Sequence, residues 1–164
     1  MAYDYYGSWS KTTGHYANLY TNSRDSNRWS TNAALSAYLK AGVPPEKIML
    51  GVGFYGYVWR GVKEGSYPAT PGLFQSGTPV NNSPGWSQIT AYLEPGSGYT
   101  RYWDDTAKAP FLYNGDRWVT YSDHEQIKIL AKYAGEKKLA GLFVWEYGHD
   151  MGADLLKTLA ENAP

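Results

Sequence analysis

Carboxylates and large aromatic rings are grouped at three places in this 164-residue chain, Tyr3–Tyr6, Tyr55–Tyr57 and Trp145–Glu146. Tyrosine and tryptophan present flat apolar faces with polar edges, which suit the C–H faces of sugar rings. A carboxylate beside such a ring can bind sugar hydroxyls or take part in proton transfer. If folding brings the three groups together, they predict a site for carbohydrate chemistry.

The amino-acid composition agrees with this prediction and excludes several others. Aromatic residues make up 16% of the chain, although burial in a core is the better explanation for any single ring. The net charge is +0 and the basic residues are scattered, which predicts no nucleic-acid partner and no membrane partner. Cysteine is absent, and His15, His124 and His149 lack the spacing of metal ligands, so the sequence predicts neither a metal nor another cofactor.

The three groups follow apolar segments that we expect to be strands, Ala2–Tyr6, Ile48–Phe54 and Leu139–Trp145. The second segment is almost continuously apolar, without polar alternation. Such a pattern is typical of a strand that is covered on both faces in a parallel sheet. A strand that begins at the first residue also favours a piece cut from a larger enzyme.

Helices are expected between these strands and after them. One begins near Ser30 or Thr31, after a long polar loop, and ends at Gly42. A second begins at Ser122, where Ser122 and Glu125 have the spacing of a capping box. A third covers Ala153–Glu161.

Residues 61–121 have a different pattern, rich in Gly, Pro and Ser. Asn114-Gly115 between two runs of strand-forming residues predicts a tight hairpin, and Gly85–Leu93 is the one candidate helix. We interpret this stretch as an inserted α+β subdomain. The expected division is therefore residues 1–60 and 122–164 for the main fold and 61–121 for the insertion.

Strands that alternate with helices indicate an α/β fold, either a doubly wound sheet or an eight-stranded barrel. No Gly-x-Gly-x-x-Gly turn follows the first strand and no P-loop occurs, which disfavours a nucleotide-binding sheet. A complete barrel needs about 250 residues. The predicted fold class is therefore α/β, the C-terminal portion of a (β/α)8 TIM barrel with an α+β insertion subdomain. In such a barrel the carboxyl ends of the strands, where the three groups lie, form the active site.

Three motifs in the chain resemble a known family. They are Met1-Ala2-Tyr3-Asp4 with Tyr5-Tyr6-Gly7, then Lys47-Ile48-Met49-Leu50-Gly51-Val52-Gly53-Phe54-Tyr55-Gly56, then Leu139-Ala140-Gly141-Leu142-Phe143-Val144-Trp145-Glu146 followed by Asp150. In order and spacing they resemble the sixth, seventh and eighth strands of family 18 glycoside hydrolases, the chitinases. The resemblance covers essentially the whole chain.

The resemblance implies a function and a set of site residues. Such enzymes cleave β-1,4-linked N-acetylglucosamine polymers with retention, and the acetamido oxygen of the substrate itself attacks the anomeric carbon. The implied catalytic residues are Tyr3, which donates to the acetamido oxygen, and Asp4, which binds sugar hydroxyls or the acetamide. The implied substrate-binding residues are Met1, Tyr5, Tyr55, Tyr57 and Trp145, with Trp145 as the floor beneath the reacting sugar. The implied ligand is chitin or a chito-oligosaccharide. The resemblance also implies that the parent enzyme is secreted, which these residues themselves do not indicate.

Two departures from the family pattern change this expectation. Tyr57 stands where many relatives have arginine, and the family's Asp-x-x-Asp-x-Asp-x-Glu motif, whose glutamate is the general acid, does not occur. Asp104-Asp105 has no suitable glutamate behind it. We therefore expect the chain alone to be inactive.

Three alternatives stay open. Asp4 and Glu146 could act as an acid and nucleophile pair, the chain could be a non-catalytic sugar-binding module, or it could be a scaffold without a ligand. Three barrel strands also leave sheet edges unpaired, so we expect partners for them, either a second copy or the missing N-terminal part of the barrel.

Overall fold

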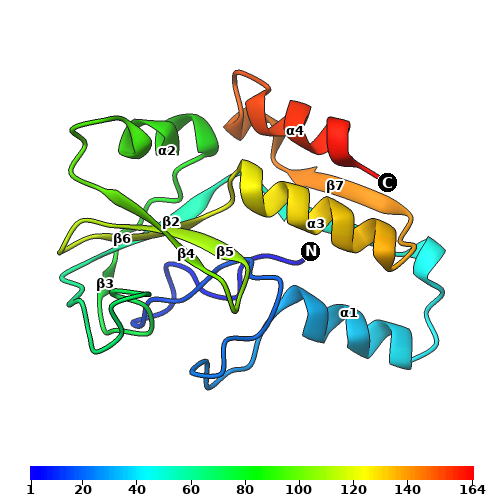
Figure 1. The fold of residues 1–164 in the computed structure, drawn as a ribbon, viewed down its shortest axis with the longest axis horizontal. Coiled ribbons are helices and arrows are strands. Elements are labelled where there is room, and N and C mark those ends of the chain that lie inside the picture. The colour runs from blue at the N-terminus through cyan, green and yellow to red at the C-terminus, as the bar shows by residue number, and fades with distance from the viewer.

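The computed structural model describes all 164 residues and contains two sheets and four α-helices (Figure 1). The elements in chain order are α1 (Thr31–Lys40), β1 (Met49–Gly53), β2 (Gly56–Arg60), β3 (Thr78–Pro79), α2 (Trp86–Leu93), β4 (Thr100–Asp104), β5 (Ala109–Tyr113), β6 (Trp118–Tyr121), α3 (His124–Glu136), β7 (Gly141–Trp145) and α4 (Asp154–Asn162), with short 3-10 turns at Pro45–Lys47 and Tyr147–His149. No helix has both the length and the apolar character needed to cross a membrane.

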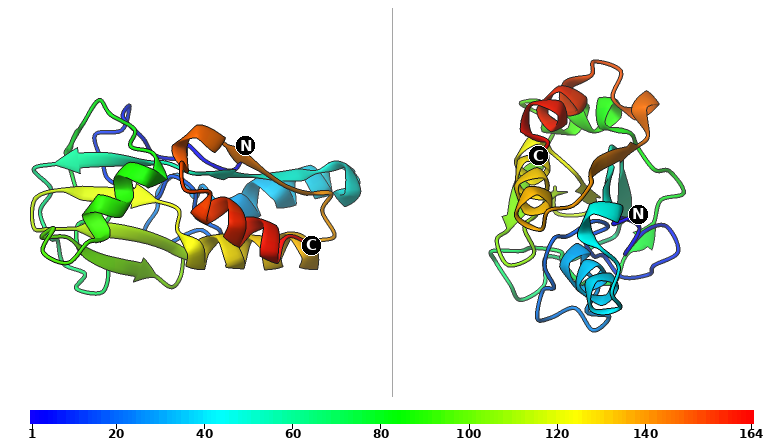
Figure 2. Two further views of the ribbon diagram at one scale, coloured as in Figure 1. Left: turned by 90° about the horizontal axis from the view of Figure 1, so that it is seen from above. Right: turned by 90° about the vertical axis from the view of Figure 1, so that its right-hand side faces the viewer.

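The two sheets differ in strand direction. β1 and β7 are parallel, in a register that pairs Gly53 with Trp145. The second sheet is antiparallel in the order β3-β2-β6-β5-β4. Only Phe54 and Tyr55 separate β1 from β2, so the chain passes directly from one sheet into the other. Seen from above, the antiparallel sheet lies at one end of the molecule, while the parallel pair and α1, α3 and α4 lie at the other (Figure 2).

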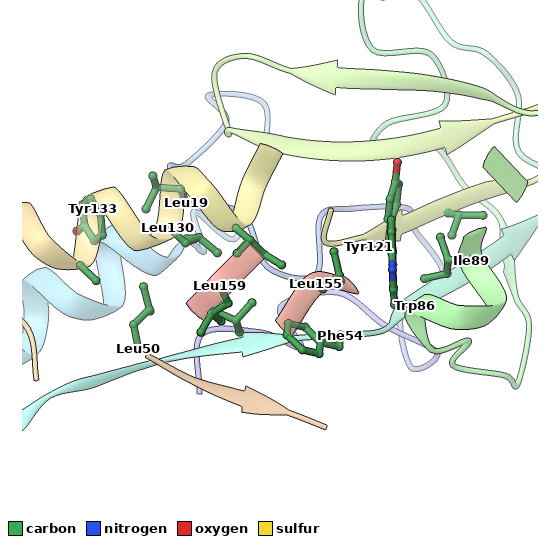
Figure 3. Close-up of a cluster of buried hydrophobic side chains, with 14 of the residues drawn as sticks. Leu19, Leu50, Phe54, Trp86, Ile89, Tyr121, Leu130, Tyr133, Leu155 and Leu159 are labelled. Carbon is green, nitrogen blue, oxygen red and sulfur yellow. The ribbon is translucent and has the colours of Figure 1, made fainter. Parts of the chain in front are cut away.

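One core fills the space between the parallel pair and the helices (Figure 3). Leu50 and Phe54 of the β1 segment point into it, and Leu155 of α4 and Ile127 of α3 are fully buried there. The other face of β1 carries Gly51, Gly53 and then Tyr55. The apolar run predicted as a buried strand is therefore confirmed, and its glycine face is left for aromatic rings from elsewhere in the chain.

A second core joins the loop after residue 7 to the antiparallel sheet. It contains the fully buried rings of Trp59, Phe111 and Trp118. His15 of the loop contacts the last two rings, and its Nε2 lies 3.0 Å from Oδ2 of Asp104 at the end of β4. This buried pair attaches the long loop to the sheet. Asp104 therefore has a structural role outside the candidate site.

Several predicted elements are confirmed. Ser30 caps α1 by accepting a hydrogen bond from the Ala33 N–H, and Gly42 follows the helix with φ 87°. The hairpin forms between β5 and β6, where Asn114 Oδ1 accepts from the Arg117 N–H and Gly115 has φ 93°.

Other predictions were wrong in detail. Residues 2–6 form no strand, because Asp4 has φ 65° and breaks the extended run. The N-cap of α3 is Asp123, which accepts from the Gln126 N–H, and not Ser122, whose hydroxyl contacts Tyr16. Glu125 does not reach back to the cap, because it pairs with Arg101.

The ends of two further elements also differ from the prediction. The strand predicted from Leu139 begins at Gly141, which has φ 142°. The last helix begins at Asp154, after the left-handed Ala153. The division at residue 60 stays a prediction, although β2, which lies before it, pairs with β6.

The Asp104 network should make the stability of the protein depend on pH. Burial raises the pKa of Asp104, but hydrogen bonds and charge from His15, with hydrogen bonds from Asn22 and the Ala107 N–H, lower that pKa to about 2. An unfolded aspartate has a pKa of about 3.9, so the folded state gains roughly 2 to 3 kcal/mol that is present above pH 4 and lost as the pH falls through 2.

We predict that Asp104→Asn lowers the free energy of unfolding at pH 7 by about this amount and flattens its decline between pH 4 and 2. Urea unfolding at a series of pH values measures both effects. The control is Asp105→Asn, since that neighbouring carboxylate is exposed and its pKa is lowered mainly by Lys108, so its loss should flatten the decline less. An unchanged acid slope in Asp104→Asn would contradict the prediction.

Candidate functional site

The candidate site is centred on the carboxylate of Asp4. Its Oδ1 accepts hydrogen bonds from the hydroxyls of Tyr55, at 2.6 Å, and Tyr57, at 2.9 Å. These donors come from the end of β1 and from β2, so the junction of the two sheets directs both toward one oxygen. No basic side chain forms an ion pair with Asp4, and Oδ2 makes no hydrogen bond within the chain.

The two donors are neutral phenols. Burial raises the pKa of both Tyr55 and Tyr57, and the hydrogen bond to the Asp4 carboxylate raises each further. Each phenol therefore keeps its proton at neutral pH and donates it. The carboxylate is held by two hydrogen bonds while its charge is not neutralised by a cation.

Tyr3 lies beside this group. Its ring packs edge-on against Tyr55, with 6.0 Å between the ring centroids, and close to Gly51, where a Cβ would lie 3.0 Å from the ring. The Tyr3 hydroxyl is buried and has no partner within the chain. Burial raises the Tyr3 pKa, as does the neighbouring Asp4. A protonated hydroxyl is thus free to donate to a ligand.

Trp145 ends β7, next to the end of β1. Its carbonyl accepts from the Phe54 N–H at 2.8 Å. Trp145 therefore lies beside Phe54, the residue that precedes Tyr55. The indole is 54% exposed although it sits on a strand. An exposed ring of this size is suited to stacking on an apolar ligand face.

Trp9 is an aromatic neighbour that sequence reasoning missed. Its indole is 60% exposed, lies over Gly7 and packs edge-on against Tyr57 at 5.4 Å. The sequence did contain a signal for it, because Gly7 stands two residues before Trp9 in the loop that follows Asp4. Trp9 and Trp145 are thus two exposed indoles, one in contact with Tyr57 and the other at the strand end beside β1.

Met1 and Tyr5 are placed apart from this group. Both line an apolar pocket against α1, together with Tyr38 and Met49. Of the predicted site residues, side-chain contacts therefore join Tyr3, Asp4, Tyr55 and Tyr57, and Trp145 lies beside the end of β1 through its backbone. A role of Met1 and Tyr5 in sugar binding stays a prediction.

The remaining acids have other contacts. Glu146 lies 3.5 Å from His149 Nε2, and the His149 ring packs edge-on against Tyr55. Asp150 is buried and accepts from the N–H groups of Asp154 and Leu156 at the start of α4. No group of three or more His, Asp and Glu side chains is arranged to hold a metal ion.

Comparison with known proteins assigns the chain to a family. The sequence model of glycosyl hydrolases family 18 matches residues 1–150. The chain belongs to this family.

Family 18 members of known name and structure are similar over nearly the whole chain. Chitinase A1 of Niallia circulans is 35% identical over 176 residues, which is 100% of this chain and 25% of that protein. A family 18 N-acetylglucosaminidase from Paenibacillus barengoltzii is 36% identical with a TM-score of 0.87, covering 99% of this chain and 47% of that one. A mutant chitinase from Cycas revoluta, solved in complex with (GlcNAc)4, is 29% identical with a TM-score of 0.83, covering 99% and 45%.

These family 18 comparisons confirm the predicted fold, the C-terminal portion of a TIM barrel. The chain spans between a quarter and just under half of the length of these three relatives. The expected α/β unit consists of the parallel strands β1 and β7 with the helices α1, α3 and α4 (Figure 1). The antiparallel strands form a second, separate sheet.

The phenols of the candidate site should make stability depend on pH in the alkaline range. An unfolded tyrosine has a pKa of about 10, and the folded pKa of Tyr57 is higher. A raised folded pKa gives a contribution that is complete below pH 10 and is lost as the pH rises above it.

We predict that the free energy of unfolding falls between pH 10 and 11.5, and that Tyr57→Phe makes this decline shallower by up to about 1.4 kcal/mol per pH unit. Denaturant unfolding across this range measures the slope. Tyr38→Phe, at an exposed ring on α1, is the control and should leave the slope unchanged. Equal slopes for Tyr57→Phe and the unsubstituted protein would show that the pKa of Tyr57 does not cause the decline.

Proposed function

We propose that this chain carries the substrate-binding wall of a chitinase that cleaves β-1,4-linked N-acetylglucosamine polymers by the retaining, substrate-assisted mechanism. The observation that carries the proposal is the Asp4 carboxylate, held by two phenol donors beside the unpartnered hydroxyl of Tyr3. The (GlcNAc)4 complex of the Cycas revoluta relative supports the choice of ligand.

The proposed mechanism assigns a role to each group. The substrate's acetamido oxygen attacks the anomeric carbon, and the Tyr3 hydroxyl donates a hydrogen bond to that oxygen and orients it. Asp4 Oδ2, free of partners within the chain, accepts from the acetamide N–H or a sugar hydroxyl. Trp145 forms the stacking floor, and Trp9 extends the aromatic surface beyond Tyr57.

A proton donor for the leaving oxygen is required in addition. The family's Asp-x-x-Asp-x-Asp-x-Glu motif is not found in this sequence. Asp4 and Glu146 do not provide a replacement in this proposal, because the Glu146 carboxylate faces His149. The chain alone is therefore proposed to bind the sugar without cleaving it.

The exposed indoles favour a second candidate function, a non-catalytic binding module for chito-oligosaccharides. The affinity of the chain for a chito-oligosaccharide distinguishes the substrate-binding wall of a chitinase from a binding module. A binding module should bind the tetrasaccharide at micromolar concentrations, whereas an incomplete cleft should bind it on the order of a thousandfold more weakly, which corresponds to about 4 kcal/mol.

We predict no turnover of a chromogenic chito-oligosaccharide above that of Tyr3→Phe, and weak binding of (GlcNAc)4 that is lost in Trp145→Ala because the stacking face is removed. Tryptophan fluorescence and NMR titration measure binding. Trp29→Ala is the matched control, since Trp29 is also exposed but packs against Tyr6. Turnover well above that of Tyr3→Phe would instead support an Asp4 and Glu146 pair, and micromolar binding would support the module.

The proposal also includes a partner for the open edge of β7. This strand pairs with β1 on one side only, and Gly141–Val144 are partly exposed. Unpaired apolar strands associate with other strands. The edge should therefore pair with a second copy of this chain or with the N-terminal part of a family 18 barrel.

We predict that the purified chain self-associates through this edge, so that its apparent mass rises with concentration. Light scattering over a wide concentration range measures the mass. Lysine in place of Leu142 should reduce the association, because charge on an edge strand opposes pairing. A monodisperse monomer at every concentration would contradict the prediction.

A further inference from the structure

Tyr16 lies beneath the candidate site and was not among the predicted site residues. It belongs to the loop between residue 7 and α1 and is 1% exposed. Its hydroxyl donates to the carbonyl of Gly53 at 2.8 Å and lies 2.6 Å from the Ser122 hydroxyl. A phenol hydroxyl can donate one hydrogen bond, and the Tyr16 hydroxyl donates it to the Gly53 carbonyl. Ser122 is therefore the donor in the bond to Tyr16.

The backbone of Tyr16 is attached to two further segments. Its carbonyl accepts from the Tyr5 N–H at 3.0 Å, and its own N–H donates to the Thr120 hydroxyl at 3.0 Å. The first bond fixes the peptide that directly follows Asp4, where the chain has the unusual φ of 65°. The second bond ties this position to β6 of the antiparallel sheet.

The ring of Tyr16 contacts both donors to Asp4. It packs edge-on against Tyr55, with 5.2 Å between centroids, and against Tyr57, with 6.2 Å. Gly53 makes this approach possible, because a Cβ there would lie 2.9 Å from the Tyr16 hydroxyl and 2.8 Å from the Tyr55 ring. One buried residue therefore contacts the two phenol rings and the backbone beside the carboxylate that they bind.

We propose that Tyr16 is a positioning residue that sets the direction of the Tyr55 and Tyr57 hydroxyls relative to Asp4. The inference rests on the proposed function only where it concerns the sugar. The Tyr16 hydroxyl holds the Tyr16 ring in place through Gly53 and Ser122, and this ring packs against the two phenol rings. A tyrosine that only filled the core would affect stability but not the hydrogen bonds to Asp4.

The matched comparison is between two tyrosine-to-phenylalanine substitutions. Tyr133 on α3 is 3% exposed, and its hydroxyl donates to Asn32 Oδ1 at 2.8 Å, away from Asp4. Tyr16→Phe and Tyr133→Phe therefore each remove one buried hydroxyl, and both should lower the melting temperature. Only Tyr16→Phe should change the site.

The hydroxyl protons of Tyr55 and Tyr57 report on the site directly. Hydroxyls held in hydrogen bonds away from solvent exchange slowly and give separate proton NMR signals, which Tyr55→Phe and Tyr57→Phe assign. We expect Tyr16→Phe to broaden or remove both signals and to weaken (GlcNAc)4 binding about tenfold, as expected for the loss of about one hydrogen bond. Tyr133→Phe should leave the signals and the affinity unchanged.

Ser122→Ala is the second variant, which keeps the Tyr16 ring and its bond to Gly53. It should broaden the two signals partly, and it replaces Tyr16→Phe if that protein does not fold. Sharp, unshifted hydroxyl signals in both Tyr16→Phe and Ser122→Ala would overturn the inference. If the unsubstituted chain binds no sugar at all, the proposed function fails, and the hydroxyl signals still decide the role of Tyr16.

Discussion

The candidate site depends on the absence of side chains from one face of β1. A Cβ at Gly51 would lie 2.7 Å from Phe143, and a Cβ at Gly53 would collide with Tyr16 and Tyr55. The opposite face of the strand is apolar and is buried against α1, α3 and α4 (Figure 3). One strand therefore anchors the core with one face and admits tyrosine rings with the other.

The electrostatics of the site follow from this packing. Buried phenols stay neutral, because ionisation without water is costly, and they can only donate to the nearby carboxylate. The Asp4 carboxyl group has no cationic partner, and its Oδ2 makes no hydrogen bond within the chain.

The position of the site at the junction of two sheets explains how distant residues meet. β1 and β2 are consecutive but belong to different sheets, and the turn at Tyr55 directs two tyrosines toward the N-terminal segment. The long loop after residue 7 is fastened to the antiparallel sheet by His15 and Asp104 and returns Tyr16 beneath these rings. The loop thus contacts both the antiparallel sheet and the tyrosines around Asp4.

Local chemistry in the sequence was sufficient for several features. The apolar run of β1, the Ser30 cap of α1 and the Asn114-Gly115 hairpin each depend on neighbouring residues, so their patterns predicted them. The closeness of the β1 and β7 ends, which carry Tyr55 and Trp145, followed from the rule that the carboxyl ends of parallel strands meet at one edge.

Only the tertiary structure decided the features that depend on contacts between distant residues. Ser122 had a capping pattern, but Tyr16, 106 positions earlier, contacts its hydroxyl, and Asp123 caps the helix instead. The segment before Tyr6 reads as a strand, but its backbone turns at Asp4. Trp9 and Tyr16 gained their places through packing against Tyr57 and Tyr55. Periodicity and turn chemistry describe a residue's nearest neighbours, whereas these positions were set by which distant groups filled the space and satisfied the hydrogen bonds.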